Sequence, residues 1–330
     1  MPARAERKAK WLCQGLGAVL GVAVALLIVE FLQQPLVQDT WRGLWYEPNE
    51  KVQSIEDDLL LTGTGKRIFA ATHPTLEDKD SFNEHCESYN REVSLLGCYV
   101  DGEIHVYEIT REGLTDSNKV TMAHELLHAV WERTSAGEKE KIKKLLEGVR
   151  QENEAWFEEE LKTYTDESKL EEIWTRAGTK LRDLPEELER AYAKYFQNRM
   201  QIVEFYENYQ APFRELQARN EKLKAEILAA KDQITLEREA YLAAMTELDE
   251  AIDKFNECAD ETGCFTADEF QHERERLVSE RERLEQVREE LNTRIEKNNA
   301  KVAEYQENQL ALGELADAMN SKVEGIEEKK

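Results

Sequence analysis

The chain has little proline, little glycine and a deficit of positive charge. It contains 6 Pro and 15 Gly in 330 residues, so few positions interrupt a regular helix. Lys and Arg number 44 against 69 Asp and Glu, and the formal net charge is -25. Because such an acidic surface repels phosphate backbones, we expect no nucleic-acid partner. The scarcity of helix breakers predicts long helices.

Hydrophobic residues make up 41% of the chain and charged residues 34%. The first fraction is too high for a disordered chain, and the second is too high for one compact globule. We therefore expect a folded domain together with long, solvated helical surfaces. At this length, one large domain or two ordinary domains are possible.

One long hydrophobic run stands near the N-terminus, over residues 11–32. About 20 apolar residues cross a bilayer core, so this run predicts a single transmembrane anchor. Basic residues in the preceding tail, residues 1–10, predict a cytoplasmic N-terminus and an extracytoplasmic remainder in the cell membrane. The alternative is a cleaved signal peptide, which would end in a small-x-small site, and none is obvious before QQPLVQDTW.

The cysteines contain no CxxC motif, which argues against a zinc site made of thiolates. Cys13 lies in the predicted anchor. Cys86 with Cys98, and Cys258 with Cys264, form two close pairs. Short loops of this kind are typical of disulfides in an oxidising compartment, which agrees with the predicted topology. Free buried thiols are the alternative.

Residues 36–115 have a mixed pattern. We predict a helix over 50–61, a short strand over RIFAAT (67–72), and a loop or short helix over 81–94. Two β-rich runs, LLGCYV and EIHVYEI, flank Asp101-Gly102, which is a strong hairpin signal. A small sheet therefore precedes the next helical region.

From 117 to 210 the pattern is helical. Asp116 or Ser117 is placed to cap a helix through residue 133, and Ser135 with Glu138 resembles a capping box. Another helix is predicted from about Asp166 to Gly178. A last one follows Pro185, and its apolar stripe consists of Ala191, Tyr192, Tyr195, Phe196, Met200, Val203 and Tyr206.

Residues 211–326 carry sustained heptads among Glu, Arg and Lys, which predicts coiled coil. The break at CADETGCFTADEF separates two runs of similar length, so we predict an antiparallel helical hairpin with its tip there. The alternative is one parallel oligomeric coil, in which Asn220 and Asn298 would fix the register. The second run has its heptad residues at Leu277, Leu284, Leu291, Asn298, Tyr305, Leu312, Met319 and Ile326.

The motif His124-Glu125-Leu126-Leu127-His128 carries the chemistry. Residues i and i+4 share one helix face, so His124 and His128 can bind one Zn²⁺ at about 2.0–2.1 Å. Glu125 lies beside that face, where it would act as general base toward a zinc-activated water. The metal would lower the pKa of this water toward about 7 and polarise the scissile carbonyl.

A catalytic zinc needs a third protein ligand. No HxxGxxH continues the motif, and the one later histidine, His272, lies in the predicted coil, so we expect a carboxylate. Glu172 in KLEEIWTRAG is the preferred residue, with Glu171 as its closest alternative. Weaker candidates are Glu167, Glu186, Glu187 and Glu189.

HELLH followed by a helical glutamate resembles the gluzincin group of zinc metallopeptidases. More narrowly, residues 69–213 are similar to uncharacterised membrane-anchored bacterial HExLH proteins. The matching segments are Cys86…LGCYV, TMAHELLH, EIWTRAGTK and LPEELERAYAKYFQNR. The resemblance implies that Glu172 occupies the acidic position of the third segment. The chain departs from the pattern at Trp174, where His is common, and at Lys180, where Glu is common.

We predict no catalytic or metal-binding role for the remaining tyrosine, arginine and histidine candidates. Tyr192, Tyr195 and Arg199 lie on a helix expected to face the site, but we favour packing and surface charge over stabilisation of an oxyanion. His73 and His85 are predicted to be plain loop residues. His105 lies in the hairpin, where it can face either side.

These features predict an α+β, mostly α fold. A small β-hairpin or sheet and helices form a minimal zincin-like domain at 36–210, followed by the coiled-coil hairpin. The expected function is that of a membrane-anchored extracytoplasmic zinc metallopeptidase acting on a peptide or protein substrate. The alternative is a non-catalytic cell-envelope scaffold or regulator with a structural or vestigial zinc site. Its coil would bind a coiled-coil partner or a second copy of the chain.

Overall fold

The computed structural model describes residues 34–86, 95–162, 164, 166–260 and 264–322. The chain divides into two compact units, and the division falls within one helix, between Ala211 and Pro212. Residues up to Ala211, together with those from Ala318 onward, form the first unit. Residues Pro212–Asp317 form the second.

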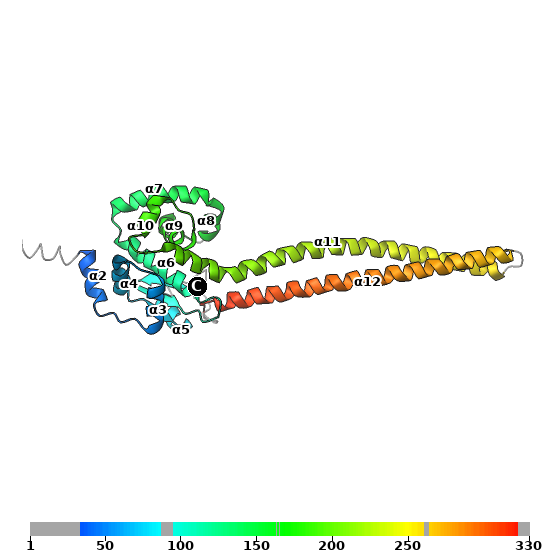
Figure 1. Cartoon of the computed structure of the whole chain (residues 1–330), viewed down its shortest axis with the longest axis horizontal. Coiled ribbons are helices and arrows are strands. Elements are labelled where there is room, and N and C mark those ends of the chain that lie inside the picture. The colour runs from blue at the N-terminus through cyan, green and yellow to red at the C-terminus, as the bar shows by residue number, and fades with distance from the viewer. Residues whose placement is uncertain (1–33, 87–94, 163, 165, 261–263, 323–330) are drawn as a thin grey trace, which may run out of the picture. The chain divides into compact units, whose positions relative to one another are not determined.

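The first unit is a mixed α and β structure (Figure 1). Within its described residues, most elements are helices surrounding a small sheet. In chain order they are α2 (Pro35–Gly43), α3 (Glu50–Asp58), α4 (Gly63–Ala71), β1 (Thr75–Glu77), α5 (Lys79–Cys86), β2 (Gly97–Val100), β3 (Glu103–Tyr107), α6 (Asp116–Arg133), α7 (Ala136–Glu152), α8 (Glu154–Glu160), α9 (Asp166–Lys180), α10 (Glu186–Tyr192) and the start of α11 (Arg199–Asp260).

The sheet has the strand order β1-β3-β2. Strands β2 and β3 pair antiparallel around Asp101 and Gly102, whose φ values of 52° and 79° suit a two-residue hairpin turn. This confirms the predicted hairpin. Strand β1 pairs parallel to β3 with Thr75 opposite His105. It has only three residues, too few to produce a periodic sequence signal.

The two faces of the sheet pack against different helices. Ile104 and Val106 of β3 join the main hydrophobic core with α6, in which Met122, Leu126 and Leu127 are completely buried. The intervening residues of β3 point to the opposite face, because side chains alternate along a strand. There Tyr107 packs with a smaller cluster of Phe82, Cys86 and Cys98, and the last two form a disulfide.

The predicted strand over RIFAAT is wrong, because residues 67–71 belong to helix α4 and Thr72 is its C-cap. The Thr62 side chain accepts a hydrogen bond from the backbone N–H of Gly65 and caps the helix. Phe69 and Ile68 are buried on one helix face. Gly65, three residues before Ile68, is buried as well, which is a helical spacing, but the aromatic and β-branched composition resembled a strand.

The single helix predicted after Pro185 is also wrong, because α10 ends at Tyr192 and α11 begins at Arg199. The backbone between them hydrogen-bonds to an earlier segment, Leu60–Thr62, and Phe196 bridges Leu61. Ser135 caps α7 as predicted. Helix α6 instead has Thr115 at its N-cap without a side-chain bond. The Ser117 hydroxyl donates to the Leu114 carbonyl.

The second unit is a pair of long antiparallel helices, the remainder of α11 and α12 (Ala267–Ala318). Ion pairs join the two helices at Arg219–Glu304, Glu226–Lys301 and Glu237–Arg294. The residue numbers rise along one helix as they fall along the other, which confirms the antiparallel hairpin. A disulfide links Cys258 to Cys264 near the turn.

The buried seam of α12 follows the predicted heptad through Leu277, Leu284 and Leu291. Farther along, the buried positions are Asn308 and Leu315 rather than Tyr305 and Leu312. Met319 belongs to the first unit, where it packs with Val120, Phe205 and Tyr209. Ile326 lies outside the described residues.

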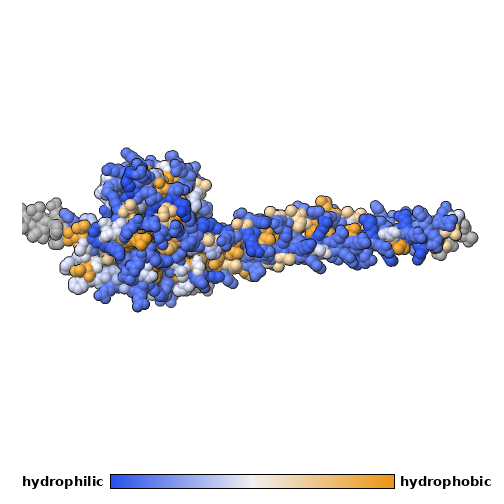
Figure 2. Space-filling model, viewed as in Figure 1, coloured by the Kyte–Doolittle hydropathy of each residue, from blue (hydrophilic) through white to orange (hydrophobic). Residues whose placement is uncertain are grey.

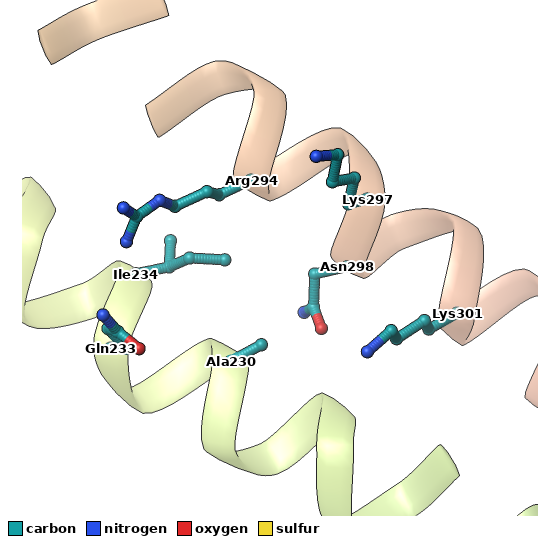
Figure 3. Close-up of a pocket in the computed structure, with 7 residues that line it drawn as sticks. All are labelled: Ala230, Gln233, Ile234, Arg294, Lys297, Asn298 and Lys301. Carbon is teal, nitrogen blue, oxygen red and sulfur yellow. The ribbon is translucent and has the colours of Figure 1, made fainter. Parts of the chain in front are cut away.

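Polar side chains interrupt the leucine seam of the hairpin. A groove of about 170 Å³ lies between α11 and α12, where the small side chain of Ala230 faces Asn298 (Figure 3). Oδ1 of Asn298 is buried without a hydrogen-bond partner. The leucine packing is therefore looser at this layer than at Leu284 or Leu291.

The predicted anchor, residues 11–32, lies outside the described residues. Among the residues that the structure describes, no helix combines the length and hydrophobicity needed to cross a membrane.

Candidate metal centre

Helix α6 presents His124 and His128 on one face, as the i, i+4 spacing requires. The opposite face, with Met122, Ala123 and Leu126, is buried in the core and fixes the rotation of the helix. Both imidazoles keep a small exposed fraction, 17% and 16% of the side chain. The pair therefore lies at the edge of the core, within reach of solvent.

Helix α9 packs against α6 and brings Glu172 to the two histidines. The Nε2 atoms of His124 and His128 lie 3.2 Å apart. Glu172 Oε2 lies 3.7 Å from Nε2 of His124, and its Oε1 lies 3.4 Å from Nε2 of His128. Ligand atoms of a tetrahedral Zn²⁺ with these bond lengths are about 3.3 Å from one another. The three side chains therefore fit the spacing and donor set of a zinc ion.

Glu171, the alternative third ligand, has a different partner. The Nδ1–H of His128 donates to its Oε1 over 2.7 Å. A carboxylate in this position orients an imidazole and raises its basicity as a metal ligand. The structure thus separates the two neighbouring glutamates: Glu172 joins the two Nε2 atoms, and Glu171 holds the far side of His128.

The weaker candidates do not join the cluster where they are described. Glu186 pairs with Arg190, Glu187 also approaches Arg190, and Glu189 pairs with the buried Arg199. The side chain of Glu167 lies outside the described residues.

The pKa values of the clustered residues are shifted by burial and by their charged neighbours. Burial disfavours the charged form of His128, but hydrogen bonds with Glu171 and Glu172 outweigh burial and raise its pKa to about 10. Burial lowers the pKa of His124. Burial also opposes the ionised form of Glu172, but the His128 hydrogen bond and nearby positive charges lower its pKa to about 2. The two carboxylates therefore favour positive charge at His128, whereas His124 favours the neutral form that a metal ligand needs.

Glu125 is 5% exposed, and burial raises the pKa of its carboxyl to about 7. Its position depends on Gly97 at the start of β2. A Cβ atom on Gly97 would lie 2.8 Å from Oε1 of Glu125 and 2.6 Å from Cγ2 of Thr121. The absence of a side chain at residue 97 therefore lets the edge strand approach Glu125 closely.

Charged and polar residues that were not predicted from the sequence lie next to Glu172. Arg176 lies one turn along α9, and its Nε donates to Glu172 Oε2 over 3.2 Å. It also pairs with Glu160, and its Nη2 donates to the Tyr164 hydroxyl over 3.2 Å. The i, i+4 spacing of Glu172 and Arg176 was visible in the sequence. The contributions of Glu160 and Tyr164 depend on tertiary packing.

The two departures from the resembling proteins are not among the three ligands, although the charge of Lys180 acts on His124. Trp174 is buried in the core, with its ring 4.1 Å from the Tyr192 ring and stacked on it. Lys180 pairs with Glu160 over 2.8 Å. Neither residue belongs to the metal-ligating group of His124, His128 and Glu172.

The packing role expected for Tyr192 agrees with its contacts, whereas Arg199 is buried and is not the surface charge that we expected. The Tyr192 hydroxyl donates to the Trp174 carbonyl over 2.7 Å. Arg199 is 4% exposed and donates to the carbonyl of Gly178 in the last turn of α9 and to those of Leu181 and Arg182 just after it. These carbonyls have no partner within the helix, so Arg199 caps α9.

Comparisons with protein-family models, curated proteins and solved structures found no match to this chain. The likeness to gluzincins therefore rests on the motif segments themselves.

Proposed function

We propose that the chain is a zinc-dependent peptidase whose metal is held by His124, His128 and Glu172. The observation that carries the proposal is the convergence of two Nε2 atoms and one carboxylate at 3.2–3.7 Å. Two of these residues come from α6 and the third from α9, 44 residues after His128, so local helix geometry alone does not produce the cluster. A bound zinc ion would supply Lewis acidity toward a carbonyl and a lowered pKa for water.

Glu125 is the proposed general base. Its buried carboxyl, adjacent to the ligand pair, accepts a proton from the attacking water and returns it to the leaving amine. Glu171 keeps His128 oriented through Nδ1. Tyr164, with its hydroxyl on Arg176, is the proposed donor to the oxygen that gains negative charge on the attacked carbonyl.

A peptide is the substrate class that suits the sheet. Strand β2 is one edge of the described sheet, and Gly97 at its start contacts Glu125. An extended peptide that adds to such an edge gains main-chain hydrogen bonds. Binding along β2 would bring a backbone carbonyl past Glu125.

The proposed location is the outer face of the cell membrane, with residues 11–32 as anchor. Helix α2 follows this segment, and four large hydrophobic side chains in it or just after it, Leu36, Trp41, Leu44 and Trp45, are 55–76% exposed. Figure 2 shows hydrophobic surface at this end of the first unit. Tryptophan is enriched at membrane–water interfaces. Buried Asp39 of α2 pairs with Arg133 of α6, so α2 is tied to the helix that carries the proposed metal ligands.

The test uses the full chain in detergent. We expect Glu125→Gln to keep its zinc and to lose cleavage of a peptide library by about 10²–10⁴-fold, the usual contribution of a general base. Glu140→Gln, on the exposed surface of α7, is the matched control and should cleave as the wild type does. Unchanged cleavage by Glu125→Gln would refute the mechanism.

The scaffold hypothesis has one supporting observation, the exposed leucines of the hairpin at Leu228, Leu236 and Leu242. It predicts bound zinc without turnover in the wild type. It also predicts a cellular phenotype that survives Glu125→Gln and is lost when the hairpin is deleted.

A further inference from the structure

A second group of histidines and a carboxylate lies on the opposite face of the sheet from α6. Glu77 ends β1, His105 is central in β3, and His85 projects from α5. The ligand atoms that they offer all lie within 4.8 Å of one another. Sequence reasoning treated His85 as an ordinary loop residue and left His105 open.

Both imidazoles point the same atom at one carboxylate. Nδ1 of His105 lies 2.7 Å from Glu77 Oε1, and Nδ1 of His85 lies 3.0 Å from Oε2. Their rings stack with centroids 4.3 Å apart and planes 20° apart. The charge partners of Glu77, among the described residues, are these two imidazoles rather than Lys or Arg.

Two of the three side chains are buried, which distinguishes this group from an ordinary surface ion pair. Glu77 and His105 have side chains 8% and 7% exposed, whereas His85 is 46% exposed. The Thr75 hydroxyl donates to Glu77 Oε1 over 2.6 Å, which holds the carboxylate in place. The group therefore has a fixed, buried base and one solvent-facing side through which an ion can enter.

A covalent bond positions the third residue. Cys86 follows His85 directly, and its disulfide partner Cys98 lies opposite His105 in the β2–β3 register. The disulfide thus ties the end of α5 to the sheet at the row that contains His105. This constraint holds His85 above His105 before any ligand binds, which lowers the ordering cost of binding.

We propose that Glu77, His85 and His105 form a second metal site for a borderline divalent cation of the Zn²⁺ class. Two imidazole nitrogens and one carboxylate oxygen are the ligands such ions prefer, and a zinc ion would bind them at about 2.0–2.2 Å. To bind the ion through Nδ1, each imidazole would be neutral with its proton on Nε2, and any further proton would pass to solvent. It links β1, β3 and α5, so its role is to hold the sheet rather than to act on substrate.

The experiment measures zinc per chain by mass spectrometry on the full chain in detergent, after chelation and dialysis against a small zinc excess. We expect about two zinc ions in the wild type and about one in His85→Ala and in Glu77→Gln. His73→Ala is the control, because the His73 ring stacks on Tyr46 outside both groups. It should keep both ions. Circular dichroism verifies that each variant is folded.

His128→Ala separates this inference from the proposed peptidase centre. If the wild type holds one ion that His128→Ala loses and His85→Ala keeps, the second site is refuted and the first stands. If His85→Ala loses the ion and His128→Ala keeps it, the reverse holds. Equal loss in His73→Ala and His85→Ala would mean non-specific histidine binding and would also refute the second site.

Discussion

The first unit buries ionisable side chains in its interior, whereas the hairpin of Pro212–Asp317 keeps its ion pairs at the surface. Glu125, Glu172 and Arg199 are each less than 9% exposed, and each has a specific environment. In the hairpin, the pairs Arg276–Glu273 and Arg283–Glu280 are solvated, and the buried residues are mainly leucine. Burying charge costs free energy unless it is paired. The candidate reactive groups are therefore buried ionisable residues of the first unit, whereas the hairpin is an extended helix pair with a mainly leucine seam.

The largest expected effect tests the different roles of two adjacent glutamates of the first unit, one as a metal ligand and the other as the hydrogen-bond acceptor of a ligand. Glu172→Ala removes a ligand and should bring zinc binding at this centre below detection. Glu171→Ala removes only the acceptor of His128 Nδ1–H and should weaken zinc binding by about 10–100-fold. Competition with a chromophoric chelator, in the His85→Ala background, measures this centre alone. Equal losses in both variants would contradict the assignment.

The next effect compares a buried ion pair with a solvated one. Arg133→Ala leaves Asp39, which is 5% exposed, without its partner. We expect the free energy of unfolding to fall by about 3–5 kcal/mol, the usual cost of breaking a buried pair. Arg283→Ala in the hairpin should produce no measurable change. Urea titration followed by circular dichroism measures both, and a similar effect in the two variants would remove the contrast.

A smaller effect concerns the close approach of β2 to the general base. Gly97→Ala places a Cβ atom against Glu125 and Thr121, so we expect kcat/KM to fall by about 100-fold with zinc content unchanged. Gly148→Ala in α7 is the control, because a Cβ there meets nothing within 4 Å. Loss of zinc in Gly97→Ala would show that the strand supports the ligands rather than the base.

The features that could be predicted from the sequence are those that depend on residues close together in the chain rather than on tertiary packing. His124 and His128 were predictable because one helix turn places them together. The hairpin seam at Leu277, Leu284 and Leu291 was predictable because heptads repeat. Both signals depend on neighbours within one helix.

Residues that depend on packing between elements were harder to predict. Glu172 was preferred over Glu171, but only the rotation of α9 against α6 gives them different partners. The group of Glu77, His85 and His105 was missed because β1 has three residues and its pairing with β3 is non-local. Gly97 carried no sequence signal, since its role depends on the distance between β2 and α6.

The smallest expected effect lies in the hairpin. It tests whether buried polar residues fix the register of the two helices there. The ion pairs Glu226–Lys301 and Arg219–Glu304 put Asn220 and Asn308 in the same layer, and both are buried with amide atoms that lack hydrogen-bond partners. A polar residue in a coiled-coil seam costs stability and fixes register. We expect Asn220→Leu with Asn308→Leu to stabilise the hairpin by about 1–3 kcal/mol, since a buried unsatisfied group costs about that much.

The same double variant should loosen the register, because leucine layers can pair with one another interchangeably. Carbodiimide cross-linking of Lys301 to Glu226 reports the native register, and thermal melts report stability. Asn292→Leu, on the exposed surface of α12, is the control and should change neither quantity. A lower melting temperature in the double variant would mean that the asparagines stabilise the seam, and the hairpin would then resemble the first unit in depending on buried polar groups.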